Sequence, residues 1–192
     1  GVGKTSCARI LAKTINDNDN KSNNGDYSFN IFELDAASNN GVDEIKRLNE
    51  QVRIPPRIGN YKIYIIDEAH MLSTAAFNAF LKTLEEPPKH AIFILATTEK
   101  NKIIPTILSR CQIYNFKLIP TDKIKKFLEK VCQQKKLEYE NEALNVIAKK
   151  ADGAMRDALS ILDKIISFTK GKITRSEVNK NLNVLDHETY FT

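Results

Sequence analysis

The chain contains no tryptophan, and its 192 residues include only seven glycines, six prolines and three cysteines. It also lacks any apolar run near the roughly 20 residues that a membrane-spanning helix needs. The apolar stretch at 10–15 is short and is interrupted by Lys13, which does not fit a signal peptide. We therefore expect no membrane partner.

The scarcity of cysteine argues against two further classes of protein. Cys7, Cys111 and Cys132 are odd in number and far apart in the sequence, whereas disulfide frameworks and zinc sites need paired or clustered cysteines. The sequence predicts neither, and a reducing, cytoplasmic location is the expectation. We expect the three thiols to be buried or inert.

Positive charge is in moderate excess. Lysine and arginine total 29 against 24 acidic residues, which gives a net charge of +5 and a pI near 9.0. This balance is compatible with a nucleic-acid partner. The chain is also rich in lysine, asparagine and isoleucine, as an AT-rich genome would encode, so part of its basicity reflects composition. Its 42% of hydrophobic residues suffices for one medium-sized domain, alone or with a small second one.

Four short segments rich in β-branched and aromatic residues predict strands at 30–35, 61–66, 91–96 and 112–116. Two of them are nearly continuous apolar runs, as expected for parallel strands that are covered on both faces. A helix is predicted at 74–84, where Ser73 can act as the N-cap and Pro87 ends the helix. Alternating strands and helices indicate an α/β fold with a parallel, doubly wound sheet.

After about Pro120 the pattern changes. It predicts helices only, at 121–134, 141–151, 154–168 and 174–181. We therefore divide the chain into an α/β domain at 1–118, a small all-α helical domain at 119–182, and the start of a linker at 183–192.

The first residues carry a chemical motif. They read as the second half of the phosphate-binding consensus G-x-x-x-x-G-K-[ST], formed here by Gly1, Val2, Gly3, Lys4, Thr5 and Ser6. Small residues let backbone N–H groups point at phosphates, the following helix offers its positive N-terminus, and the lysine adds a charge. The strand that normally precedes such a loop, in the middle of the sheet, would lie upstream of this sequence. We expect the 192 residues alone to be unstable or inactive without it.

A second motif is the apolar strand that ends in Asp67 and Glu68. The Thr5 hydroxyl and the Asp67 carboxylate are ligands of the kind that Mg²⁺ prefers, and Glu68 can orient and polarise an attacking water. Each motif alone has a plainer interpretation, as a turn before a helix or as a helix cap. Their joint occurrence in the expected order predicts a P-loop ATPase that uses ATP and Mg²⁺.

Five further segments carry a resemblance to a known family. They lie at 67–72, 77–88, 95–99, 106–111 and 153–160. In this order they closely resemble the AAA+ clamp-loader ATPases of bacterial DNA polymerase III, the gamma/tau subunits, from Gly1 to about Leu182. The resemblance implies an AAA+ P-loop fold with a helical lid, followed by a collar domain beyond the linker.

The resemblance also implies a function and its residues. Such subunits form a hetero-oligomeric ring that uses ATP to open a sliding clamp and load it onto primer-template DNA. Arg110 would act in trans as an arginine finger on a neighbour's nucleotide. Thr98 matches the family's sensor 1, with Thr97 as the alternative, and Arg156 matches sensor 2. The plainer interpretations are a surface arginine, a strand-end threonine and an ion pair of Arg156 with Asp152.

DNA and zinc are two further points of comparison with the family. Lys46 lies in a segment that looks like the family's DNA-tracking helix, although Asp43 and Glu44 also suit an ordinary helix cap. Relatives usually carry a four-cysteine zinc module after the first helix. Here the stretch 16–30 is asparagine-rich and has no cysteine, so it predicts a solvated polar loop. Zinc is therefore not expected.

Three functions stay open. An ATP-hydrolysing clamp-loader subunit is favoured, because Lys4, Thr5, Asp67 and Glu68 are all present. The alternatives are a non-hydrolysing clamp-loader subunit and another DNA-acting AAA+ ATPase, such as a replication factor C small subunit or a branch-migration motor. His70 completes an Asp-Glu-Ala-His sequence also seen in helicases, but this length cannot hold a helicase's second core domain. We interpret His70 as structural or as a support for the acidic pair.

Overall fold

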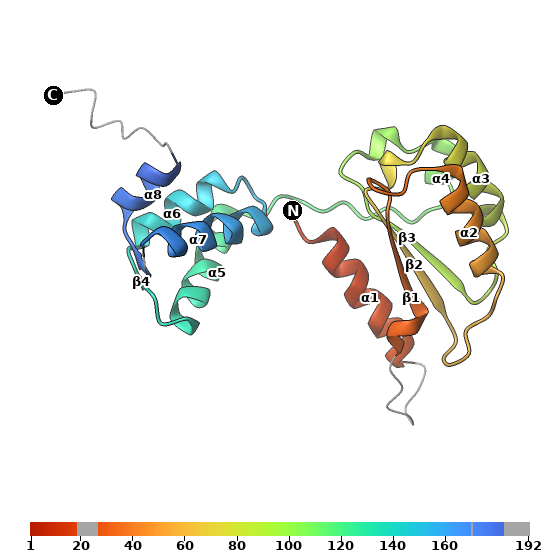
Figure 1. Ribbon diagram of the computed structural model, residues 1–192, viewed down its shortest axis with the longest axis horizontal. Coiled ribbons are helices and arrows are strands. Elements are labelled where there is room, and N and C mark those ends of the chain that lie inside the picture. The colour runs from red at the N-terminus through yellow and green to blue at the C-terminus, as the bar shows by residue number, and fades with distance from the viewer. Residues whose placement is uncertain (19–26, 170, 183–192) are drawn as a thin grey trace. The chain divides into compact units, whose positions relative to one another are not determined.

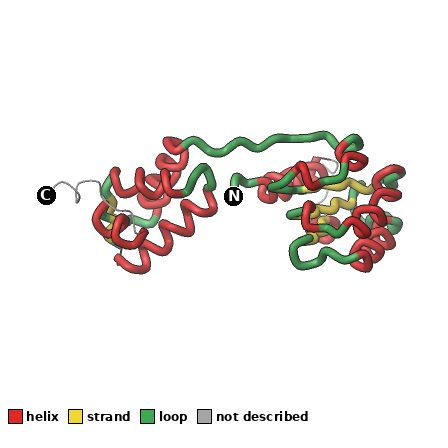
Figure 2. Tube along the Cα trace, turned by 90° about the horizontal axis from the view of Figure 1, so that it is seen from above, coloured by secondary structure: helices red, strands yellow, loops and turns green. Residues whose placement is uncertain are grey.

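The computed structural model describes residues 1–18, 27–169 and 171–182. The chain forms two compact units, which we call the sheet unit, Lys4–Tyr114, and the helical unit, Gly1–Gly3 with Asn115–Thr192. Their elements are labelled in Figure 1 and coloured by type in Figure 2. No helix in these described ranges is both long and apolar enough to cross a membrane.

The sheet unit is built on a three-stranded parallel sheet. Its strands are adjacent in the order β1-β2-β3, formed by Ile31–Asp35, Lys62–Asp67 and Ala91–Leu95. Parallel neighbours need a crossover connection, and helices provide it between each pair. Three of the four predicted strands and their parallel arrangement are thereby confirmed.

Helices cover both faces of this sheet (Figure 1). On one face Ala8 and Ala12 of α1 (Lys4–Asn18) pack against Ile63 and Ile65 of β2. On the other face α2 (Val42–Val52) and α3 (Thr74–Glu85) pack against the alternate side chains of β2. Because β2 is buried on both faces, its sequence is a continuous apolar run. The observed layers confirm the predicted α/β class.

Aromatic rings hold the three strands in register. Phe32, Tyr64 and Phe93 are partners across β1, β2 and β3, with ring centroids 5.1 and 5.5 Å apart, and Phe80 of α3 meets Phe93 edge-on at 5.2 Å. Such pairs add about 0.5–1.5 kcal/mol each beyond their burial. The ladder aligns the strands, so their carboxyl ends meet at one edge of the sheet.

Capping at α3 agrees with the sequence. The Ser73 hydroxyl accepts a hydrogen bond of 3.1 Å from the Ala76 N–H, as an N-cap should. Short elements complete the sheet unit: the 3₁₀ helices η1 (Tyr27–Asn30), η2 (Ala69–Met71) and η3 (Lys100–Lys102), and the single-turn helix α4 (Pro105–Leu108).

The predicted strand at 112–116 is wrong. This segment pairs with none of β1, β2 and β3, and Ile113, Tyr114 and Phe116 are exposed. An apolar segment becomes a strand only where a neighbour pairs with its backbone N–H and C=O groups. The composition of this segment indicates a preference for extended backbone, but it does not specify a strand with which the segment could pair.

Two other expectations also need correction. Asn16 lies inside α1 and is fully buried, so the predicted solvated loop does not begin there; its central residues, 19–26, and the linker at 183–192 lie outside the described residues. Cys132 is buried and Cys111 is half-buried, and burial raises the pKa of both thiols. Cys7 is exposed on α1, so the expectation of burial fails for this residue.

The helical unit contains the four predicted helices, which are thereby confirmed. They are α5 (Thr121–Gln134), α6 (Asn141–Lys150), α7 (Met155–Thr169) and α8 (Arg175–Leu182). They share an apolar core that includes Leu128, Leu144 and Leu162. An addition is a parallel pair of two-residue strands, β4 (Glu138–Tyr139) and β5 (Lys172–Ile173), which are too short to leave a periodic signal in the sequence.

Candidate active site

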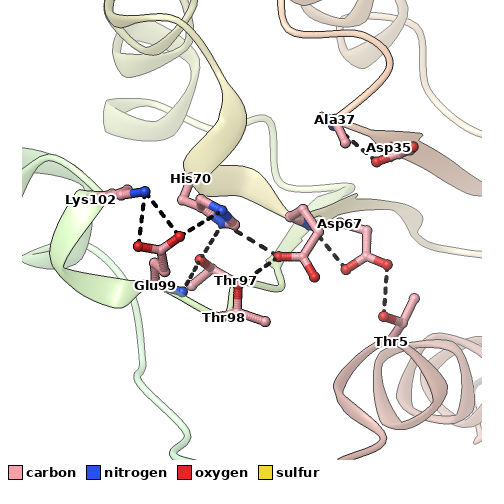
Figure 3. Close-up of polar contacts among 10 residues, drawn as sticks. Thr5, Asp35, Ala37, Asp67, His70, Thr97, Thr98, Glu99 and Lys102 are labelled. Atoms are coloured by element: carbon pink, nitrogen blue, oxygen red, sulfur yellow. Dashed lines mark hydrogen bonds and ion pairs between the residues drawn. The ribbon is translucent and has the colours of Figure 1, made fainter. Parts of the chain in front are cut away.

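Polar side chains gather where the parallel strands end, as Figure 3 shows. Asp67 is the last residue of β2 and Glu68 follows it, while Thr97 and Thr98 come shortly after β3. Backbone hydrogen bonds tie these ends together: the Ala96 N–H donates to Ile66 and its carbonyl accepts from Ala69, each at 2.9 Å. Ligand sites of open parallel sheets lie at this carboxyl edge.

Thr5 and Asp67 are in direct contact. The Thr5 hydroxyl donates to Asp67, with Oγ1 to Oδ2 at 2.8 Å, and the Glu68 N–H donates to the other carboxylate oxygen at 3.0 Å. Thr5 lies in the first turn of α1, and the packing of Ala8 and Ala12 against β2 brings that turn to the strand end. A hydroxyl and a carboxylate side by side are the oxygen ligands that suit Mg²⁺.

A metal at this position would not rest on a cage of protein side chains. Among the described residues, no group of three or more histidine, cysteine, aspartate or glutamate side chains could hold a metal ion. Magnesium usually binds one or two protein groups and completes its shell with water and substrate phosphates. The Thr5–Asp67 pair fits that pattern.

The start of α1 also fits an anion. Its first turn has no acidic residue, and the first four N–H groups of a helix have no partner within the helix. Lys4 is half-buried and makes no hydrogen bond or ion pair with any residue that the structure describes. Ser6 is exposed, and Gly1, Val2 and Gly3 belong to the helical unit, with Gly3 at φ +97°. The helix start and the lysine can therefore accept a phosphate.

Glu68 has an unusual backbone conformation. Its φ of 45° and ψ of 43° lie in the left-handed region, which costs a non-glycine residue about 1–2 kcal/mol. The Thr98 hydroxyl donates to its carboxylate, with Oγ1 to Oε2 at 3.1 Å, and its side chain is 34% exposed. Strained turns of this kind cluster at functional sites. The carboxylate is both held and open to solvent.

His70 lies beside this carboxylate. Its side chain is only 7% exposed, and its Nδ1 lies 3.0 Å from the Thr97 hydroxyl and 3.4 Å from Glu68 Oε2. Its Nε2 lies 3.4 Å from Glu99 Oε1 on the opposite side. Lys102 donates to Glu99 at 3.0 Å, and this hydrogen bond is the main cause that lowers the pKa of Glu99. Glu99 was not among the residues predicted for the site, and its only signal in the sequence is its place directly after the two strand-end threonines.

Asp35 ends β1 and is the register partner of Asp67, but it is not part of this cluster. Its carboxylate accepts hydrogen bonds from the Ala37 N–H at 3.0 Å and from the Ser38 hydroxyl at 2.8 Å. These are local turn contacts of the kind that aspartate commonly makes after a strand.

Arg110 lies just beyond α4. Its guanidinium pairs with Glu85 at the end of α3, with 3.0 Å from the NH2 nitrogen to Oε1, and donates to the Thr106 carbonyl at 2.7 Å. The side chain is 40% exposed. Its described contacts do not include Thr5 or the acidic pair, as would be expected of a residue that acts on another subunit. The trans role stays a prediction.

The remaining two predicted residues are exposed. Lys46 on α2 pairs with Asp43, one turn earlier, at 3.2 Å. Arg156 on α7 belongs to the helical unit, and its guanidinium forms no ion pair with Asp152 or with another described residue. The structure therefore does not contain the ion pair that was the alternative for Arg156. Its role, and that of Lys46, stays a prediction.

Comparison with protein families identifies two matching models. Residues 1–120 match the family described as DNA polymerase III, delta subunit, and residues 123–171 match the DNA polymerase III clamp loader subunit, ATPase lid domain. The chain is 50% identical over 190 residues to DNA polymerase III subunit tau of Bacillus subtilis, covering 92% of this chain and 33% of the relative. It is 40% identical over 201 residues to subunit tau of Escherichia coli, covering 98% and 31% respectively. The chain thus spans about a third of the length of these relatives.

Solved structures share the fold. The Thermotoga maritima RuvB Holliday junction branch migration motor matches with a TM-score of 0.71 at 20% identity, covering 96% of this chain and 59% of that one. A DNA polymerase III gamma subunit-related protein from Thermotoga maritima matches with a TM-score of 0.51 at 21% identity, covering 97% and 67%. At this level of identity the likeness establishes a common fold and nothing more.

Proposed function

This chain belongs to the DNA polymerase III gamma/tau family of AAA+ clamp-loader ATPases, and we propose that it is the ATP-hydrolysing part of a bacterial replicative clamp loader. One observation carries the proposal: the Thr5 hydroxyl lies 2.8 Å from the Asp67 carboxylate, directly before Glu68, at the end of a buried parallel strand. A subunit that only binds nucleotide needs no group to activate water. The presence and support of Glu68 favour hydrolysis.

The binding roles follow from the chemistry of the side chains. Bound Mg·ATP supplies the γ-phosphoryl group and a metal that neutralises its charge. Thr5 and Asp67 present the oxygen ligands for the metal. The N–H groups that begin α1 bind the phosphates, together with the loop residues Gly1, Val2, Gly3, Lys4 and Ser6.

Glu68 orients the attacking water and accepts its proton as the bond to phosphorus forms. Thr98, whose hydroxyl now donates to Glu68 at 3.1 Å, is the residue that we assign to sensing the γ-phosphate. A hydroxyl beside both groups can exchange its hydrogen bond between Glu68 Oε2 and the phosphate, while Oε1 stays free to bind water. Binding and activation would then be linked through one side chain.

Arg110 completes the site of a neighbouring subunit in this proposal. Its present partner Glu85 is 49% exposed, and exposed ion pairs contribute little. A phosphate is a stronger, bidentate partner for a guanidinium, so an adjacent nucleotide can displace Glu85. Arg156 on the lid contacts the nucleotide of its own subunit, and Lys46 on α2 contacts DNA phosphates, which carry no sequence information.

We assign the chain three partners: other clamp-loader subunits in a hetero-oligomeric ring, a sliding clamp, and primer-template DNA. Replication places this assembly in the bacterial cytoplasm. We assign residues 1–118 to the nucleotide-binding domain and residues 119–182 to the helical lid. Zinc has no role in this scheme.

The test uses the full-length protein in its reconstituted assembly. ATP hydrolysis should be stimulated jointly by primed DNA and a sliding clamp, and more than by either alone. Glu68→Gln should reduce this hydrolysis by about 10²- to 10⁴-fold, to a measurable residual rate, while ATP affinity stays within about twofold. Normal ATP binding without hydrolysis would instead indicate a non-hydrolysing subunit, and stimulation by DNA that ignores the clamp would indicate another DNA-acting AAA+ ATPase.

A further inference from the structure

We propose that His70 is the positioning residue for Glu68, holding one oxygen of its carboxylate so that the other faces the attacking water. The inference rests on the proposed function, since it concerns the same catalytic carboxylate. It goes beyond it by assigning to a buried histidine, and to Glu99 behind it, a role that the nucleotide motifs do not contain.

The contacts to Glu68 are one-sided. Thr98 Oγ1 lies 3.1 Å and His70 Nδ1 lies 3.4 Å from the same atom, Oε2. Oε1 has no hydrogen-bond partner among the residues that the structure describes. Two contacts on one oxygen restrict the rotation of the carboxylate and leave the other oxygen for water. This is the arrangement that a general base needs, because the productive geometry must be held before the reaction begins.

The histidine is itself held on both sides of its ring. The Thr97 hydroxyl lies 3.0 Å from Nδ1, and Glu99 Oε1 lies 3.4 Å from Nε2. Thr97 also accepts the Glu99 N–H at 3.0 Å, so its hydroxyl is anchored by the same turn. Lys102 holds the Glu99 carboxylate at 2.9 Å. Figure 3 shows these contacts from Lys102 through Glu99 to His70.

The location of His70 lets it contact two loops. It lies on η2, whose backbone joins the end of β3 through the hydrogen bond from Ala69 to Ala96. Glu68, in its left-handed conformation, is the residue that begins this turn. His70 therefore bridges the loops after β2 and β3, and an imidazole can do so because it has polar atoms on both sides of the ring.

A second histidine provides a comparison. His90 comes before β3 and is half-buried, and its imidazole Nε2 lies 2.8 Å from the Val52 carbonyl. That contact ties α2 to the opposite end of the sheet, so it stabilises the fold without reaching the acidic pair. His90→Ala is therefore the matched control for loss of a structural imidazole.

The experiment compares His70→Ala, His70→Asn, Glu99→Gln and His90→Ala in the full-length protein and its reconstituted assembly. For His70→Ala we expect kcat of the stimulated ATPase to fall about ten- to hundredfold, the range typical when a positioning group is lost, while the Kd for ATP changes less than about twofold. His70→Asn keeps a donor toward Glu68 and should recover much of the loss. Glu99→Gln should show a smaller fall, and His90→Ala none.

Hydrogen exchange provides a readout that needs no catalysis. In the nucleotide-free protein, the peptide that covers residues 66–72 should exchange faster in His70→Ala and Glu99→Gln than in wild type or His90→Ala, because the turn that carries Glu68 loses its support. If His70→Ala does not fold, the same comparisons are made with His70→Asn. This variant should then exchange slightly faster and hydrolyse slightly more slowly than wild type.

Combination with Glu68→Gln separates positioning from general stabilisation. If His70 acts through Glu68, His70→Ala should cause no further loss of hydrolysis in the Glu68→Gln background. A further tenfold loss there, or wild-type kcat in His70→Ala, would overturn the inference while leaving the proposed function intact. Normal hydrolysis by Glu68→Gln itself would instead overturn the proposed function.

Discussion

The guanidinium of Arg110 and the carboxylate of Glu85 form an ion pair of 3.0 Å. Glu85 is the last residue of α3, and Arg110 lies two residues after the end of α4. Their side chains are 40% and 49% exposed, so solvent screens the pair and its contribution to stability lies at about 0–1 kcal/mol. Arg110 is thus oriented at the surface by a partner that it can exchange at little cost.

This relationship predicts a split phenotype for Arg110→Ala. ATP binding by the isolated subunit should stay nearly unchanged, and the free energy of unfolding should change by less than about 1 kcal/mol. DNA-stimulated hydrolysis in the assembly should fall by about 10³-fold, because an arginine finger neutralises charge in the transition state. Nucleotide-binding fluorescence and steady-state ATPase assays measure the two effects. Arg53→Ala, at the exposed end of α2, is the control, and an equal loss of binding in the isolated subunit would refute the trans role.

The Thr5–Asp67 contact predicts that magnesium strengthens ATP binding only when residue 5 carries a hydroxyl that can bind the metal. Thr5→Ser keeps the hydroxyl and should retain the affinity measured with Mg²⁺. Thr5→Ala should weaken Mg·ATP binding about tenfold or more but leave the weaker binding measured with EDTA unchanged. Titration with a fluorescent ATP analogue, with and without magnesium, makes the comparison. An unaltered magnesium dependence in Thr5→Ala would show that the metal site lies elsewhere.

The buried phenol of Tyr64 predicts a loss of stability in alkali. Its side chain is 2% exposed, its hydroxyl has no partner among the described residues, and burial raises its pKa to about 12. The folded pKa is above the ordinary value of about 10, so ionisation of this phenol favours the unfolded state. The free energy of unfolding should therefore be independent of this group below pH about 10 and should fall as the pH rises from about 10 through about 12. Tyr64→Phe should therefore be more stable by about 1 kcal/mol at neutral pH, with a larger gain above pH about 10.

Urea unfolding at pH 8 and pH 11 measures these differences. Tyr139→Phe is the control, because that hydroxyl is not deeply buried and accepts a hydrogen bond of 3.3 Å from Gln133. A stability difference between Tyr64→Phe and wild type that does not grow with pH would contradict the assignment.

Gly153 predicts a strong local constraint in the helical unit. Its φ is +75°, and an added Cβ would lie 2.6 Å from Leu118 Cβ and 3.2 Å from the Ile119 nitrogen. Gly153→Ala should destabilise the unit by about 2–4 kcal/mol, since strain and a clash add. Gly171→Ala, at φ +96° with its nearest atom 3.5 Å away, should lose only about 1 kcal/mol. Hydrogen exchange of α7 measures the loss of stability in both variants. An equal loss in Gly153→Ala and Gly171→Ala would contradict the role of the clash.

The thiols should react in a defined order. Cys7 is exposed on α1, whereas Cys132 is fully buried and burial raises its pKa, which lowers the fraction of reactive thiolate. With iodoacetamide at pH 8, Cys7 should be modified first, Cys111 more slowly, and Cys132 only on unfolding. Peptide mass spectrometry follows each site, and simultaneous labelling of Cys7 and Cys132 would be inconsistent with this fold.

Much of the secondary structure was predictable, because it depends on neighbours in the sequence. The continuous apolar run of β2 reports burial on both faces, and Ser73 reports the start of α3, since its cap bond reaches only three residues ahead. The strand predicted at 112–116 was wrong because a strand also depends on residues that are distant in the sequence. Its composition favours extended backbone, but pairing depends on a partner that composition does not specify.

The sequence by itself determined the longer helices, the three strands of the parallel sheet and the hypothesis of a phosphate loop and an acidic pair, because these follow from local backbone preference, hydrophobic period and residue chemistry. Only the tertiary structure decided that His70 lies between Glu68 and Glu99, and that Arg110 pairs with Glu85. Glu99 is 29 residues from His70, and Glu85 is 25 residues from Arg110. Contacts over such separations depend on the path of the chain through space, which no local pattern encodes.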